Sequence, residues 1–238
     1  MSTALAEPSF PPLMSGRATL GADPFAAARK AAAEGCDGGL ILHNVTAERL
    51  RAAIVFAPDV PLAQAVAMLP VCAVGLQNAL GALAPPEVGV HLDWSGPVRV
   101  NGARCGGVRM AADTSDPDEI PGWLVVGWDL VFSREAEAPG ETPDETALYE
   151  EGCGDLDPVH LLEAWARHTL VWINRWTDEG NRPVHAEWTG LLHDTGKTVT
   201  VAGRTGEALG ADEAFGLLLK NAAGTHLIPL TTLLEGTQ

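Results

Sequence analysis

Apolar and polar residues follow two different periods along this chain, and each period predicts one kind of element. Ala-rich composition and apolar residues at helical spacing predict helices at residues 24–34, 61–80 and 157–177. The first and third begin at an Asp-Pro pair and end shortly before a Gly, which is typical of helix ends. Pro70 is expected to kink the second helix, because proline cannot donate a backbone hydrogen bond.

Runs of apolar and β-branched residues between turn signals predict the strands. In the first part of the chain they lie at residues 39–45, 52–57, 88–94, 98–100, 103–111 and 123–132. Asn101-Gly102 is a strong hairpin-turn signal between two of them. Four short, evenly spaced strands follow Lys197, at residues 198–201, 206–209, 215–219 and 225–228, which favours a small β-barrel. Residues 1–20 show no period and are expected to be a lead-in.

These elements predict an α+β fold. A mixed, mainly antiparallel sheet is expected, backed by packed helices on one side and followed by a small C-terminal β-barrel of the Src-homology type. The expected division is a first domain at residues 1–185 and a second at residues 186–238. The 238 residues are enough for one full core and a small appendage.

The charge balance limits the partners. There are 15 Lys and Arg against 31 Asp and Glu, a formal net charge of −16. Such a surface repels nucleic acids and anionic membranes, so neither is an expected partner, although solubility alone also explains the acidity. With no signal-peptide pattern and polar residues interrupting the apolar stretch at 62–83, a cytoplasmic protein is expected. The four scattered cysteines favour buried thiols and no metal site.

The segment that begins at Trp94 resembles a known family. It runs Trp-Ser-Gly-Pro, then a turn, then Arg104 and Gly107, and a later strand ends in Leu-Val-Val-Gly. The order is similar to that of the biotin/lipoate–protein ligase superfamily, in which Trp-Pro-Asn-Asp is followed by a Lys, a Gly and a strand ending in Gly-Ile-Asn. The downstream helix and Gly-rich strands keep the family's order, so the resemblance spans residues 22–238. The chain most resembles ligase-like members of unknown activity.

The resemblance implies two acyl transfers. A small carboxylic acid of the biotin, lipoate or octanoate type is joined to the α-phosphate of ATP, and a lysine of a biotinyl or lipoyl carrier domain then takes the acyl group. An active member would therefore use ATP and Mg. The reaction requires stabilisation of crowded anionic oxygens and shielding of the adenylate from water.

This chain departs from the family's pattern where that chemistry is performed. The loop at residues 44–51 has no Gly-x-Gly and only two arginines, Arg49 and Arg51. Gly96-Pro97 replaces the Asn-Asp pair and offers no carboxylate to a metal. Loss of one preorganised charge-stabilising donor costs about 3–4 kcal/mol of transition-state stabilisation. The departures therefore argue against ATP-dependent ligase activity.

Arg104 is the candidate catalytic residue, since it stands at the Lys position and its guanidinium suits carboxylates and phosphates. A solvated strand arginine is the alternative. The remaining expected substrate-binding residues have their own alternatives, which are a core position for Trp94, a bulge for Gly106 and Gly107, surface charge for Arg49, and an ordinary strand position for His43.

Three functions remain open from the sequence. The first is a ligase-like protein that keeps a pocket for an acyl carboxylate, with ATP chemistry reduced or lost. The second is an active ligase or acyltransferase in which Arg104 replaces the usual charge-stabilising group. The third is a non-catalytic interaction protein that uses the carrier-docking face, for instance as a homodimer.

Overall fold

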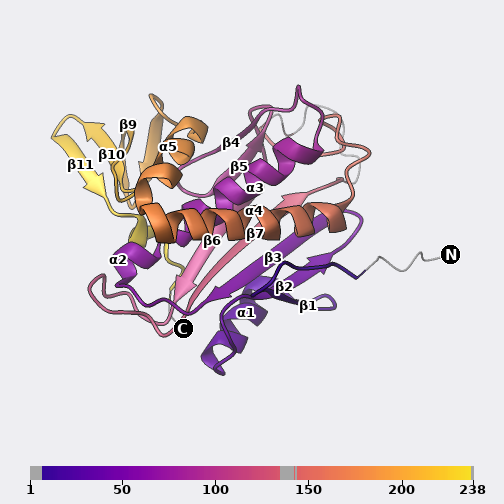
Figure 1. Cartoon of the computed structure of the whole chain (residues 1–238). Coiled ribbons are helices and arrows are strands. Elements are labelled where there is room, and N and C mark those ends of the chain that lie inside the picture. The colour runs from indigo at the N-terminus through magenta and orange to yellow at the C-terminus, as the bar shows by residue number, and fades with distance from the viewer. Residues whose placement is uncertain (1–6, 135–141, 143, 237–238) are drawn as a thin grey trace.

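A seven-stranded sheet forms the centre of the molecule in this computed structural model, which describes residues 7–134, 142 and 144–236 (Figure 1). Its strands are β1 (Ser15–Ala18), β2 (Leu40–Val45), β3 (Arg49–Phe56), β4 (Val90–Leu92), β5 (Pro97–Val100), β6 (Ala103–Ala112) and β7 (Leu124–Val131). The order is β1-β2-β3-β7-β6-β5-β4, and every neighbouring pair is antiparallel except β1 and β2. The predicted mixed, mainly antiparallel sheet is confirmed.

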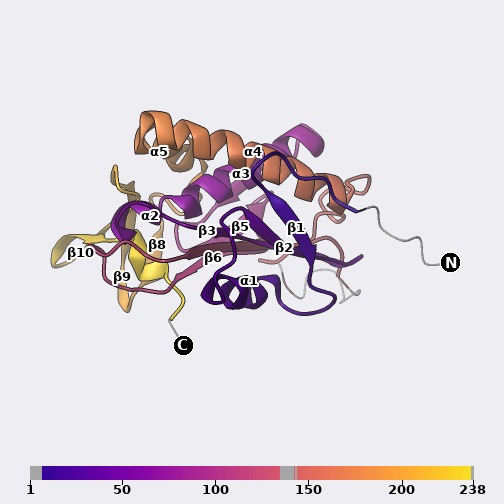
Figure 2. The same cartoon turned by 60° about the horizontal axis from the view of Figure 1, so that its bottom comes forward.

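Helices cover both faces of this sheet, so the expectation of helices on one side is wrong. Figure 2 shows α3 (Met68–Leu83) and α4 (Pro158–Glu179) above the sheet and α1 (Pro24–Ala33) below it. The two sides have separate apolar cores. The larger core includes α3 and α4, and the smaller one joins Phe25 and Ala28 of α1 to alternate residues of β2, β3 and β7.

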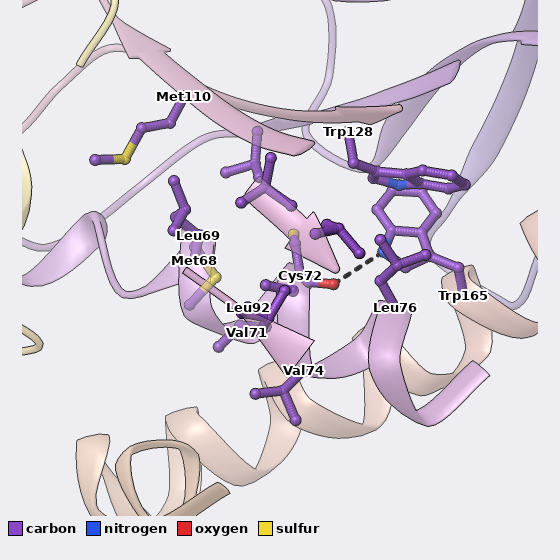
Figure 3. Packing of buried hydrophobic residues seen from close by; sticks show 14 of the residues in the cluster. Met68, Leu69, Val71, Cys72, Val74, Leu76, Leu92, Met110, Trp128 and Trp165 are labelled. Atoms are coloured by element: carbon purple, nitrogen blue, oxygen red, sulfur yellow. Dashed lines mark hydrogen bonds between the residues drawn. The ribbon is translucent and has the colours of Figure 1, made fainter. Parts of the chain in front are cut away.

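The larger core is centred on α3, whose residues are mostly apolar and buried (Figure 3). Trp165 of α4 donates its indole N–H to the carbonyl of Cys72 at 3.1 Å, and its ring meets Trp128 of β7 edge-on at 5.2 Å. The segment Leu62–Leu83 is long and apolar enough to cross a membrane, yet 72% of its most apolar 18-residue stretch is buried inside the protein. It packs as a core helix between the sheet and α4.

The helix ends agree with the sequence in two cases and differ in a third. Asp157 caps α4, because its carboxylate accepts the backbone N–H groups of Val159 and His160. The helix predicted over 61–80 is divided into α2 (Leu62–Ala65) and α3, so the break precedes Pro70. Pro70 lies in the first turn of α3, where a missing N–H loses no helical hydrogen bond.

A second, four-stranded sheet lies at the C-terminal end. It consists of β8 (Thr198–Val201), β9 (Arg204–Ala211), β10 (Leu217–Asn221) and β11 (Gly224–Ile228), all antiparallel in the order β11-β10-β9-β8, followed by the short helix η1 (Leu230–Leu233). The four predicted C-terminal strands are confirmed. The domain boundary after residue 185 stays a prediction, and it falls inside α5 (Asn181–Leu191), a helix that the sequence reasoning missed.

Candidate ligand-binding site

On the face of the sheet that carries α1, the part under the helix is apolar and the neighbouring part of the same strands is polar. Ala53 and Val55 of β3 pack against α1. Because alternate residues of a strand share a face, Arg49 and Arg51 of β3 must point to the same side as those two. Asp129 of β7 lies directly opposite Arg51 in the register.

Strand β6 extends this polar face. Gly107 is aligned with Asp129 and Arg109 with Gly127, which places both on the α1 side. A bulge between β5 and β6 shifts the register so that Arg104 is aligned with Arg99. Arginines of β3 and β6 therefore surround the single carboxylate of β7.

Two adjoining cavities open on this face and share Arg49 and Asp129. The first has a volume of about 310 Å³ and is lined by Phe25 of α1 and by Arg51 and Arg109 among others. The second has a volume of about 410 Å³ and includes Arg104, Gly106 and Glu145 in its lining. The first cavity also has an aromatic ring in its lining, that of Phe25.

Some of these charges already have partners. Arg49 donates to Asp129 at 2.7 Å. Arg109 donates to Asp23 at 2.8 Å, and its guanidinium stacks 4.2 Å above the Phe25 ring. Arg51 and Arg104, in contrast, have no ion pair or side-chain hydrogen bond to any residue that the structure describes. Within the described part of the chain, two guanidinium groups thus have no anionic partner, and each suits an anionic ligand.

Four of the predicted site residues come together here. Arg49 and Arg104 contribute charge, while the two glycines differ in their surroundings. A Cβ at Gly106 would lie 2.0 Å from the carbonyl oxygen of Asp129, so this glycine allows β6 and β7 to approach at the bulge. A Cβ at Gly107 would meet nothing closer than 3.5 Å, so packing does not require a glycine there.

Trp94 and His43 lie elsewhere. Trp94 is fully buried. It donates its indole N–H to the carbonyl of Phe215 at 2.8 Å and its backbone N–H to the carboxylate of Asp194 at 2.9 Å. It thereby joins the main sheet to the C-terminal sheet, as the core alternative expects. His43 shares a face of β2 with Ile41 of the larger core, on the side of the sheet opposite to the arginines.

The sequence reasoning missed Arg109 and Asp129. Each stands in a strand of mostly apolar residues, two residues from a glycine on the same face. That placement was the available signal, because a charged residue inside a buried strand must reach solvent or a partner.

The described residues suit an anion better than a metal ion. No group of three His, Cys, Asp or Glu side chains within residues 7–134, 142 and 144–236 is placed to hold a metal. Mg²⁺ in nucleotide sites is usually held by one or two carboxylates together with phosphates. Asp129 is the central carboxylate of this face, and it already forms an ion pair with Arg49.

Comparisons with known proteins agree with this architecture. A model described as the biotin/lipoate A/B protein ligase family matches residues 10–190, and a domain of unknown function (DUF4444) matches residues 195–236. No curated protein matches the chain. A solved biotin protein ligase-like protein of unknown function from Silicibacter sp. TM1040 is 58% identical, with a TM-score of 0.91 over 97% of this chain and 100% of the other.

More distant structures share the fold. Biotin protein ligase from Aquifex aeolicus is 17% identical, with a TM-score of 0.68 over 90% of this chain and 92% of the other. Biotin protein ligase from Leishmania major is 13% identical, with a TM-score of 0.56 over 92% and 98%. Since the family model spans residues 10–190 of the 238, this chain belongs to the biotin/lipoate A/B protein ligase family.

Proposed function

We propose that the chain binds a small carboxylic acid of the biotin, lipoate or octanoate type on the arginine-bearing face of the sheet, and that ATP-dependent ligation by this site is reduced or lost. The observation that carries the proposal is the pair of guanidinium groups of Arg51 and Arg104. In a chain of net charge −16, arginines that have no carboxylate partner among the described residues favour an anionic ligand.

The two cavities suggest how such a ligand lies. The acid lies in the first cavity, where its carboxylate meets Arg51 and its body lies beside Phe25 and the Arg109 side chain stacked on that ring. Arg104 borders the second cavity, where it suits a phosphate group. The Aquifex aeolicus enzyme, 18% identical, has been solved in complex with biotin and ATP, which supports the proposal that this fold has room for two ligands.

The same face argues against efficient ATP chemistry. Gly96-Pro97 supplies no metal-binding carboxylate, and Asp129 is paired with Arg49. A biotinyl or lipoyl carrier domain is the partner that the family suggests. A carrier with an acidic surface would be repelled by the net charge of −16, so productive docking needs a locally basic face.

Thermal unfolding with ligands tests the proposal. Biotin, lipoate, octanoate and ATP–Mg are added singly and as acid-plus-nucleotide pairs. An acid at 100 times its Kd adds about 2.7 kcal/mol to the free energy of unfolding. We expect one acid to stabilise the protein without ATP, and Arg51→Ala to remove most of that effect. Arg204→Ala, at an exposed position on β9, is the matched control and leaves it unchanged.

The other outcomes are equally informative. If an acid and ATP–Mg stabilise the protein beyond the sum of their separate effects, and Arg104→Ala removes that excess, the chain is a working ligase or acyltransferase with a substituted site. If no acid shifts the unfolding midpoint at any concentration tested, the proposal is wrong and the interaction-protein function gains weight.

A further inference from the structure

The opposite face of the sheet has a separate cavity at the β1–β2 edge, which we call the edge cavity. It has a volume of about 600 Å³. His43 and Val45 of β2 and Ala18 of β1 form its floor, and Val159 of α4 borders it. It lies across the sheet from the arginines, so it is not part of the acid site proposed above.

The N-terminal segment closes one side of the edge cavity. The ring of Phe10 lies directly over Gly16 of β1, where a Cβ would come within 1.9 Å of that ring. The backbone N–H of Ser9 donates to the carboxylate of Glu163 on α4 at 2.8 Å. These two contacts hold the segment between β1 and α4 and give the cavity an aromatic wall.

His43 is the polar group at the centre of this cavity. It is only 7% exposed, and its ring lies 6.0 Å from that of Phe10. Neither ring nitrogen has a hydrogen-bond partner among the residues that the structure describes. Among the residues that the structure describes, the enclosed side-chain nitrogens and oxygens without a partner belong to Trp128, Thr169, Trp188 and Asp194, and the His43 nitrogens are not among them. They are therefore reachable from the cavity.

A ring nitrogen that borders a cavity and has no hydrogen-bond partner among the described residues can accept or donate to a ligand there, so the His43 ring can anchor one. Burial lowers the pKa of His43, so the imidazole is neutral at pH 7 and offers one donor and one acceptor. Glu7 also borders the cavity and acts electrostatically on His43. Arg17 borders it as well, but it is aligned with Leu42, which packs on the α1 side, and it acts on Cys36.

We propose that the edge cavity is a second binding site, for a small amine with a flat apolar body. The body packs between Phe10, Val45 and Val159, and the amine donates hydrogen bonds to the imidazole of His43 and to the carboxylate of Glu7. The carboxylate at the rim and the acidic chain favour a cation over an anion.

Histidine-ring ¹⁵N–¹H NMR of the full chain tests this site, with phenethylamine as the probe and phenylacetate as its anionic counterpart. The His43 signals are assigned by their loss in His43→Gln. We expect phenethylamine to shift these signals in a saturable way, and phenylacetate to bind at least tenfold more weakly.

Two exposed positions of β1 provide matched variants. Ala18→Leu places bulk in the edge cavity and should weaken phenethylamine binding at least tenfold. Ser15→Leu adds a side chain of the same size on the α1 face of the sheet, since Ser15 is aligned with Leu40. It should leave binding unchanged. Glu7→Gln, also at an exposed position, should weaken binding several-fold.

The proposal is overturned if phenethylamine produces no saturable shift of the His43 signals, or if Ala18→Leu and Ser15→Leu bind it equally. Tighter binding of phenylacetate than of phenethylamine would overturn the amine chemistry. None of these results depends on whether an acid binds the arginines on the other face.

Discussion

Two neighbouring aspartates at the joint between the two sheets should respond to neutralisation in opposite ways. Asp93 accepts two hydrogen bonds from Arg99, at 2.8 and 2.9 Å. Asp194 is 7% exposed, and its Oδ2 accepts the backbone N–H of Trp94 at 2.9 Å. The Oδ1 of Asp194 is enclosed and has no partner within the described part of the chain. Burial therefore raises the pKa of Asp194 above its usual value of 3.8.

The direction of the pH effect follows from that raised pKa. The folded protein holds the proton of Asp194 more tightly than the unfolded chain does. The stability contributed by this group is therefore present below the unfolded pKa and is lost as pH rises through the folded pKa. Asp194→Asn keeps an acceptor for Trp94 but cannot ionise, so it escapes this loss.

The magnitude can be estimated from the contacts. An enclosed polar group without a partner costs about 1–3 kcal/mol, and a charged one costs more. We expect the free energy of unfolding of Asp194→Asn minus that of wild type to increase by about 1–3 kcal/mol as pH rises from 4 to 8. Asp93→Asn should destabilise the protein by about 1.5–3 kcal/mol at neutral pH, because it weakens charge-assisted hydrogen bonds to Arg99.

Urea unfolding at a series of pH values measures both effects. The slope of the difference with pH is the critical quantity, since it is insensitive to the fixed cost of burying an amide. The reasoning is refuted if the difference between Asp194→Asn and wild type stays constant from pH 4 to pH 8, or moves in favour of wild type.

Two further predictions concern the site strands. Gly106→Ala should destabilise the protein by about 1–3 kcal/mol, because its Cβ would meet the carbonyl of Asp129, whereas Gly107→Ala should cost much less. Chemical denaturation compares the two, and equal costs would contradict the packing argument. Burial raises the pKa of Cys105 to about 12, so iodoacetamide at pH 8 should label Cys36 first in the folded protein and Cys105 only after unfolding. Peptide mass spectrometry measures the order, and early labelling of Cys105 would show the prediction to be wrong.

Local signals in the sequence determined a large part of the fold. Asp157 and Gly180 delimit α4. The Asp157 carboxylate accepts free backbone N–H groups of the first turn, and Gly180 adopts the positive φ with which the chain leaves the helix. Asn101 and Gly102 both adopt a positive φ, as their hairpin turn requires. The order of motifs after Trp94 was enough to indicate the family.

Long-range pairing decided what those local signals left open. Residues 15–18 have no strand period, yet they form β1 because β2 supplies their hydrogen-bond partners. The predicted second helix is interrupted by a turn at Val66 and Ala67, before Pro70. The spacing of residues does not encode either outcome.

The candidate site shows the same division. The sequence predicts a loop at residues 44–51, but Arg49 and Arg51 belong to β3, where alternation places them on a common face. The sequence also does not tell which face is open to solvent. That depends on where α1 packs, and only the tertiary structure placed His43 across the sheet from the arginines. The sequence determined which residues could act together, and the packing of the helices decided which of them share a cavity.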